Sequence, residues 1–214
     1  MISKEMQPYY NDILEGWGFQ NTFWATEEDT AVSKSLDQKL HVDALFRDPN
    51  GFRASCQGKD LSHEHERRYQ TLTVTCHKPG DNLNVRRSEL FTCMANYFMC
   101  GYRNKDQNGV VSAIIVDFKK FRDYLFTKLS VQDILDAEKD KHDGNRHRYL
   151  DVGDVVFVRV SFCELIDAWP SDIVVDTHFT EEGKQTLLAK RRAHRIGQNI
   201  NFAASEEAPQ EGQS

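Results

Sequence analysis

The chain lacks any apolar run long enough to cross a lipid bilayer, which takes about 20 consecutive apolar residues. Its first ten residues, MISKEMQPYY, also lack the apolar core of a signal peptide. These absences argue against a membrane partner. They predict a soluble protein that stays inside the cell, in the cytoplasm.

The sequence has five cysteines but no C-x-x-C spacing. An odd number without that spacing argues against both a disulfide framework and a zinc ribbon. The histidines likewise lack the paired spacing of a structural zinc site. Most cysteines fall on apolar faces, so all five are predicted to be reduced thiols in the core: Cys56, Cys76, Cys93, Cys100 and Cys163.

The chain has no excess of positive charge, because 27 Lys and Arg against 33 Asp and Glu give a net charge of -6. This total does not favour non-specific nucleic-acid binding, whose affinity comes mainly from neutralised phosphates. Basic residues nevertheless cluster, and a local basic cleft can coexist with an acidic total. The predicted nucleic-acid-binding residues are Arg67, Arg68, Lys190, Arg191 and Arg192. For any one cluster, a solvated surface remains the alternative.

Neither an internal repeat nor a domain linker is visible. A chain of 214 residues that is 39% hydrophobic and 11% aromatic can bury a sizeable core, which predicts one compact domain over residues 1–202. The final residues, SEEAPQEGQS, have almost no apolar content to justify ordering. Residues 203–214 are therefore predicted to form a disordered acidic tail.

The most informative stretch is residues 37–59, DQKLHVDALFRDPNGFRASCQGK. Two sets of residues alternate strictly on each side of the turn DPNG, which predicts a β-hairpin. On the first strand, Leu40, Val42, Ala44 and Phe46 alternate with His41, Asp43, Leu45 and Arg47. On the second strand, Phe52, Ala54, Cys56 and Gly58 alternate with Arg53, Ser55, Gln57 and Lys59.

The hairpin brings Asp43 near Gln57. Opposed residues of an antiparallel pair point to the same face, so the loop must hold an odd number of residues, either 49–51 or 48–52. With either loop the side chains of Asp43 and Gln57 lie close enough to share a small cation. Lys59 lies on the same face, and its ammonium, which has donors only, would hold a water or an anionic oxygen.

This arrangement resembles the PD-(D/E)XK nuclease superfamily, whose pattern is an acid on one strand and acid-x-lysine on the next. Here Asp43 is followed by Gln57-Gly58-Lys59, the Q-x-K form of Mrr-like members. The longer pattern Asp37-x-x-x-His41-x-Asp43 looks like a group of small phage or mobile-element endonuclease-like proteins. The likeness covers about residues 1–170, and the order of the elements carries more of it than any single motif.

The resemblance implies an α/β fold with a restriction-endonuclease-like α-β-β-β-α-β core, in which helices flank a mixed central sheet. The core elements expected are a helix over 3–17, the hairpin, a strand over 71–77, a helix over 88–102 and a buried strand over 110–116, with a short strand or lead-in over 19–25. The first helix is expected to end at Gly18, and its apolar stripe consists of Met6, Tyr9, Tyr10, Ile13 and Leu14. Later helical and strand additions are expected over 118–129, 131–140 with a cap at Ser130, 155–161 and 162–169.

The resemblance implies a phosphodiester hydrolase with Asp43, Gln57 and Lys59 as catalytic residues and Mg²⁺ or Mn²⁺ as cofactor. Asp43 would anchor the metal, Gln57 would offer its amide oxygen, and the carbonyl of Gly58 would add a third contact. Lys59 would orient the attacking water and favour its deprotonated form.

Further groups are left open by the sequence. An amide in place of a carboxylate removes one negative charge from a hard-cation site, and Asp37 is the candidate to compensate as a further metal ligand. Glu5 or Glu15 on the first helix would supply another acid. His41 either hydrogen-bonds a carboxylate or phosphate, or is a satisfied strand histidine.

Two functions of different classes follow. The first is a magnesium-dependent endonuclease that cuts DNA, encoded by a phage or mobile element and acting in the host cytoplasm. A homodimer would supply the two active sites that cutting both strands commonly requires. The second, motivated by Gln57 and the acidic net charge, is a nuclease-fold protein that has lost catalysis and serves as a nucleic-acid-binding or protein-binding subunit.

Overall fold

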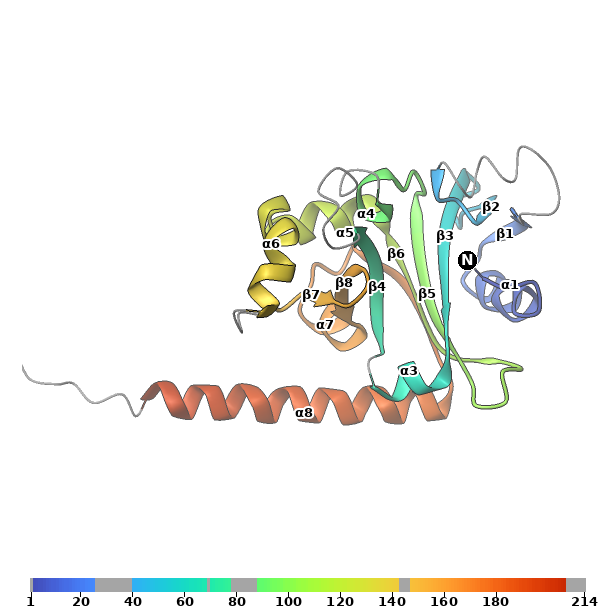
Figure 1. Ribbon diagram of the computed structural model, residues 1–214. Coiled ribbons are helices and arrows are strands. Elements are labelled where there is room, and N and C mark those ends of the chain that lie inside the picture. The colour runs from blue at the N-terminus through green and yellow to red at the C-terminus, as the bar shows by residue number, and fades with distance from the viewer. Residues whose placement is uncertain (1, 26–39, 69, 78–87, 143–146, 207–214) are drawn as a thin grey trace, which may run out of the picture.

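A six-stranded mixed sheet forms the centre of the molecule (Figure 1). The structure is a computed structural model that describes residues 2–25, 40–68, 70–77, 88–142 and 147–206. In spatial order the strands are β1 (Gln20–Trp24), β2 (Ala44–Arg47), β3 (Arg53–Leu61), β5 (Tyr97–Arg103), β6 (Val110–Asp117) and β9 (Val174–Phe179). Only β3 and β5 run parallel; the other neighbours are antiparallel. The predicted α/β class with a mixed central sheet is confirmed.

A second sheet of three antiparallel strands lies against one face of the first (Figure 1). Its order is β4 (Thr71–His77), β8 (Val156–Ser161) and β7 (Leu150–Val152). The prediction that 71–77 is the third strand of the central sheet is therefore wrong. Its threonines instead meet side chains of the central sheet: Tyr102 Oη accepts from Thr71 N at 2.8 Å and Lys59 Nζ donates to Thr75 Oγ1 at 3.0 Å. Because β4 packs onto the face of β3 and β5, it does not pair with their edges.

The predicted helix over 88–102 is also wrong. Only α4 (Glu89–Thr92) is helical, and β5 follows it. Alternate residues of β5 face opposite sides: Phe98 and Cys100 belong to the core between the two sheets, whereas Met99 belongs to the core under the first helix. This two-residue period is that of a strand, and pairing with β3 on one side and β6 on the other fixes it.

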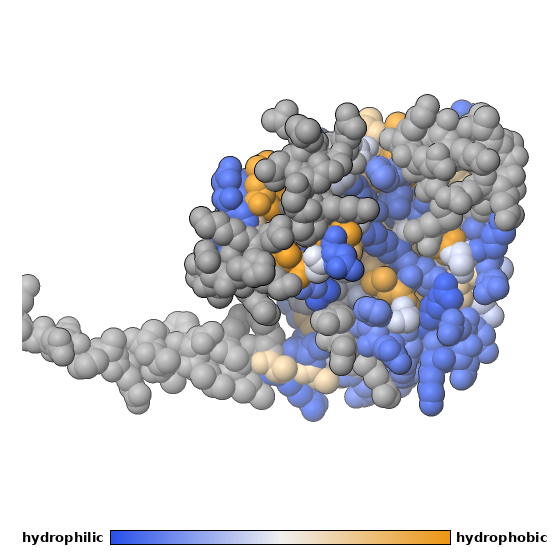
Figure 2. All heavy atoms as spheres, in the orientation of Figure 1, coloured by the Kyte–Doolittle hydropathy of each residue, from blue (hydrophilic) through white to orange (hydrophobic). Residues whose placement is uncertain are grey.

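The first helix, α1 (Gln7–Gly16), covers the other face of the central sheet. Met6, Tyr10 and Leu14 are fully buried there, as the predicted apolar stripe requires, while Tyr9 is partly exposed. Gly18 follows the helix with φ of +85°, a conformation that favours glycine, so the predicted stop is confirmed. Figure 2 shows mainly hydrophilic residues on the side of the molecule where α1 lies, at the right of the view.

The remaining helices lie around the second sheet and at the end of both sheets (Figure 1). They are α3 (His63–Arg68), α5 (Phe118–Leu125), α6 (Val131–His142), α7 (Phe162–Asp167) and α8 (Glu181–Glu206). Ser130 Oγ accepts from Asp133 N at 3.1 Å, so the predicted cap of α6 is confirmed. Helix α8 continues through residues 203–206 of the predicted tail, and 207–214 lie outside the described residues.

The later strands bear out the apolar pattern of the sequence. Residues Val110 to Val116 are all buried in β6, as predicted, and the strand predicted over 155–161 is β8. All five cysteines are free and buried, which confirms the prediction that they are core thiols. Within the described residues, no helix is long and apolar enough to cross a membrane.

Candidate active site

The β2–β3 hairpin closes through the five-residue loop 48–52, the longer of the two predicted loops. Arg47 pairs with Arg53 and Ala44 with Cys56. Asp48 fixes the turn because its Oδ1 accepts from Asn50 N at 2.9 Å and Phe52 N at 3.0 Å. Gly51 has φ of +83° in this loop, a conformation that glycine adopts without strain.

The regular strand starts at Ala44, not at Leu40 as predicted. Val42 packs in the core between the sheets, whereas Ala44 packs in the core under α1, so the predicted alternation breaks between them. His41 has φ of +49°, which turns the chain, and its carbonyl accepts from Cys93 Sγ at 3.3 Å. Asp43 N donates to Cys56 O at 2.8 Å, so Asp43 still contacts β3.

The Asp43 side chain binds the backbone of β3 between the two other predicted catalytic residues. Its Oδ2 accepts a hydrogen bond from Gly58 N at 2.9 Å. A carboxylate at this distance from an N–H group makes a charge-assisted hydrogen bond, which holds Asp43 in one orientation. The sequence thus correctly placed Asp43 beside the Gln57-Gly58-Lys59 segment.

Gln57 lies on β3 and is nearly inaccessible to solvent, at 5% exposure of the residue. Its register partner on β5 is Phe98, a residue of the core between the sheets. The buried Gln57 Oε1 accepts no hydrogen bond from the described part of the chain. A buried amide oxygen without a donor is costly, and such atoms commonly mark a site that takes a water or an ion.

Lys59 points across the space between the two sheets and meets an acid that the sequence did not reveal. Its Nζ lies 2.7 Å from Glu89 Oε2 and donates to Thr75 Oγ1 at 3.0 Å. Glu89 Oε2 also accepts from Thr75 N at 2.9 Å, which closes the triangle. The side chains of Lys59 and Glu89 are only 16% and 8% exposed, so this is a buried ion pair.

Glu89 could not be identified from the sequence, because it is the first residue of a four-residue helix and lies far from the hairpin along the chain. Neither a spacing nor a periodic pattern links it to Lys59. The only local signal is its place in the first turn of α4, where an acid is favoured by the helix dipole.

The two acids of the site lie near one thiol. Burial raises the pKa of Cys93 to about 12, and the negative charges of Glu89 and Asp43 add to the rise. Burial and then Asp43 also raise the pKa of Cys56. The charges of Asp43 and Glu89 therefore both act on Cys93, in a region of low solvent access.

Oxygen donors of this region suit a hard cation. Asp43 offers a carboxylate and Gln57 an amide oxygen, and magnesium commonly keeps several waters beside one or two carboxylates. No group of three His, Cys, Asp or Glu able to hold a metal occurs among the described residues. Asp37, the predicted compensating acid, lies outside them. Gln57 Oε1, which accepts no hydrogen bond from the described residues, is the observation that fits a bound ion best.

The other predicted acids, Glu5 and Glu15, lie just before α1 and on it. Helix α1 packs on the Ala44 and Cys56 face of the sheet, whereas Lys59 projects from the opposite face. Glu5 and Glu15 are exposed residues on the α1 side, and the suggestion that one of them contributes a further acid stays a prediction. The additional acid that the structure does bring to the region is Glu89.

The predicted basic residues lie on two other elements. Arg67 and Arg68 are on α3, and their side chains are outside what the structure describes. On α8, Arg191 makes a two-point ion pair with Asp167 of α7, at 2.5 Å and 2.6 Å. Lys190 is half-buried and Arg192 is exposed. Figure 1 shows α8 along the end of both sheets, continuing past the body of the molecule.

No protein-family model, curated protein or solved structure that was compared with this chain matches it.

Proposed function

We propose that this protein is a metal-dependent endonuclease that hydrolyses phosphodiester bonds of DNA, of the phage or mobile-element type that its sequence resembles. The observation that carries the proposal is the hydrogen bond from Gly58 N to Asp43 Oδ2. It sets the Asp43 carboxylate against the backbone between Gln57 and Lys59, which supports a common site for the three residues that the resemblance assigns to catalysis.

Asp43 and Gln57 would hold the ion, with the carbonyl of Gly58 as a third donor. A bound Mg²⁺ or Mn²⁺ would supply Lewis-acid stabilisation of the non-bridging oxygens and would lower the pKa of a water. The buried Gln57 Oε1, which has no donor among the described residues, supports this role.

Lys59 would orient the attacking water and stabilise the charge that develops on the phosphate. Hydrolysis joins the water oxygen to phosphorus, breaks the bond to the leaving oxygen, and transfers one proton of the water to that oxygen. Glu89 and Thr75 hold the Lys59 ammonium at 2.7 Å and 3.0 Å, so it is a positioned cation and not a mobile surface lysine.

The order of elements gives secondary support. The order α-β-β-β-α-β recurs in α1, the antiparallel strands β1, β2 and β3, the short helix α4 and the strand β5, which runs parallel to β3. The third strand and the second helix of this series are not the ones predicted, and α3 and β4 lie between β3 and α4. Strand β4 is an insertion between β3 and α4 that joins the second sheet.

The test is a cleavage assay with the full chain on supercoiled plasmid, linear duplex and single-stranded DNA, in Mg²⁺ or Mn²⁺. We expect cleavage that falls about a hundredfold or more in Asp43→Asn. The pair Lys59→Met with Glu89→Gln removes the cation without leaving an unpaired buried charge, and we expect it to be folded and inactive. Lys120→Met, at an exposed lysine that pairs with Asp172 elsewhere, is the matched control and should cut normally.

The low solvent access of the site favours a second function. Asp43 is 1% exposed and Glu89 neutralises Lys59, so a phosphate has little access in this conformation. This would suit a nuclease-fold subunit that binds nucleic acid or protein without cutting. Absence of cleavage on all three substrates with either metal would favour this function over the enzyme.

A further inference from the structure

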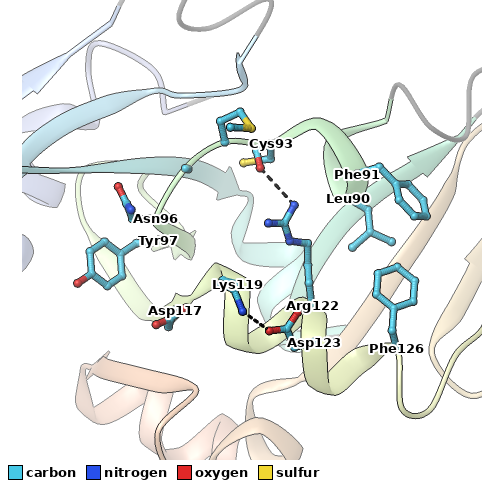
Figure 3. A pocket seen from close by; sticks show the side chains of 12 residues that line it. Leu90, Phe91, Cys93, Asn96, Tyr97, Asp117, Lys119, Arg122, Asp123 and Phe126 are labelled. Carbon is cyan, nitrogen blue, oxygen red and sulfur yellow. Dashed lines mark hydrogen bonds and ion pairs between the residues drawn. The ribbon is translucent and has the colours of Figure 1, made fainter.

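A pocket of about 580 Å³ opens between α4, the segment that follows it, and α5 (Figure 3). This volume is within the range that encloses a ligand of nucleotide size. The pocket is distinct from the Asp43 and Lys59 region, but helix α4 contributes residues to both. Its lining combines aromatic, cationic and amide groups.

One wall of the pocket is apolar and aromatic. Leu90, Phe91 and Phe126 lie together on this side in Figure 3. The rings of Phe91 and Phe126 have centroids 5.6 Å apart and an interplanar angle of 36°. Met94, also at the pocket, is 68% exposed. An exposed apolar surface with aromatic rings suits a planar aromatic group such as a nucleobase.

Arg122 supplies a cation beside this wall. Its Nη1 donates to Cys93 O at 3.3 Å, and its Cζ lies 4.8 Å from the centroid of the Phe118 ring. No carboxylate pairs with Arg122 in the portion of the chain that the structure describes. A guanidinium has five donors, so most of its capacity is left for an anion, and its fork geometry matches phosphate.

The other charges at the pocket are already engaged. Lys119 Nζ lies 2.6 Å from Asp123 Oδ2 in an exposed pair, which Figure 3 shows beside Arg122. Asp117 caps α5 by accepting from Lys120 N at 3.0 Å, where the positive end of the helix compensates it. Arg122 is therefore the group best placed to bind a phosphate.

Hydrogen bonds to β3 and the shared helix α4 connect the pocket to the candidate active site. Asn96, on the opposite wall, accepts through Oδ1 from Ser55 N at 2.9 Å and from Ser55 Oγ at 3.0 Å. Ser55 precedes Gln57 by two positions on β3. Helix α4 has Glu89 against Lys59 and the next two residues in the pocket wall, so both sites share this helix.

From this geometry we propose that the pocket binds one nucleotide of the strand that the active site cuts, with its base on the Phe91 and Phe126 rings and its phosphate on Arg122. The inference rests on the proposed nuclease function and specifies the substrate class. A base in this pocket cannot remain paired, so the substrate contains an unpaired nucleotide, in a single strand or flipped out of a duplex.

Binding of single nucleotides tests the pocket without any cleavage. We would titrate the full chain with 2′-deoxyadenosine 5′-monophosphate in EDTA, by calorimetry or NMR, and compare it with deoxyadenosine, which lacks the phosphate. We expect the nucleotide to bind, Arg122→Gln to weaken it about tenfold or more, and deoxyadenosine to be insensitive to this change. Lys120→Gln, at a cation on the same helix outside the pocket, should leave both affinities unchanged.

A second variant separates stacking from apolar burial. Phe126 is 37% exposed, so Phe126→Leu should fold, and we expect it to lose affinity for both ligands about tenfold. Absence of nucleotide binding at millimolar concentration, or an affinity that neither variant lowers, overturns the pocket. If the protein binds the nucleotide but cuts no DNA, only the proposed nuclease function is overturned. If it cuts paired and unpaired DNA equally well and Arg122→Gln does not change cleavage, only the proposed nucleotide pocket is overturned.

Discussion

Lys59 and Glu89 form a buried ion pair, with 2.7 Å between Nζ and Oε2, that joins the central sheet to α4. Phe98 and Phe157 flank the ammonium, with ring centroids 6.0 Å and 5.8 Å away. Low solvent access makes the two charges depend on each other, because either one alone would be buried without compensation. This pair connects the stability of the protein to the proposed chemistry.

Removing one member of the pair should destabilise the protein by about 3–5 kcal/mol, because the other charge stays buried. We therefore expect lower urea midpoints for Lys59→Met and for Glu89→Gln. The double variant should recover most of the loss, which gives a large coupling energy in a double-mutant cycle. Additive losses would show that the two charges are solvated independently in solution.

Gln57→Glu tests the metal site through stability. Without metal, the new carboxylate is buried near Asp43, and we expect the melting temperature to fall by roughly 3–10 °C. With millimolar Mn²⁺ the added charge should tighten binding, so the variant should gain more from the metal than the wild type does. An equal response of both proteins to Mn²⁺ would argue against a cation at Gln57.

Gly58→Ala should strain the contact between β3 and the amino-terminal segment. A Cβ at Gly58 would lie 2.6 Å from Ile2 Cδ1 and 3.6 Å from Asp43 Oδ2. Since Ile2 is fully packed, we expect a loss of about 1–3 kcal/mol in unfolding free energy. Ile2→Val removes the clashing Cδ1. We therefore expect Gly58→Ala to lower the unfolding free energy less in the Ile2→Val background than in the wild type.

The buried thiols predict a loss of stability at alkaline pH. Burial raises the pKa of Cys76, Cys93 and Cys100 to about 12. An unfolded thiol ionises near pH 8.5, so between about pH 9 and 12 the unfolded chain binds fewer protons than the folded one. Unfolding free energy therefore falls as pH rises, by up to about 1.4 kcal/mol per pH unit for each thiol. Urea denaturation at pH 7, 9 and 10 measures how steeply the unfolding free energy falls with pH. Cys100→Ala should reduce this slope by the contribution of one thiol.

The basic residues of α8 should separate into structural and binding roles. Arg191→Ala removes the two-point pair with Asp167 and should lower stability by up to about 1 kcal/mol. Arg192 is exposed, and Arg192→Ala should leave stability unchanged. If α8 contacts DNA, Arg192→Ala also lowers the slope of log affinity against log salt by about one unit. Fluorescence anisotropy at several salt concentrations measures that slope.

Several features of the candidate site could be predicted because they depend on neighbours in sequence. The DPNG turn and the alternation of Ala54, Cys56 and Gly58 fixed the register, which brings Asp43 to Gly58. The break at His41 could not be predicted, since an alternating pattern does not reveal a positive φ. Glu89 could not be predicted either, because only the packing of α4 against β4 brings it to Lys59.

The sequence by itself determined the local elements: the α1 stripe and its stop at Gly18, the hairpin, the buried strand β6 and the core thiols. Side-chain period and turn chemistry act over a few residues, so they are readable in the chain. Only the tertiary structure decided that β4 belongs to a second sheet and that residues 97–103 are a strand. Those choices depend on hydrogen-bonding and packing partners far away in sequence, which no local pattern specifies.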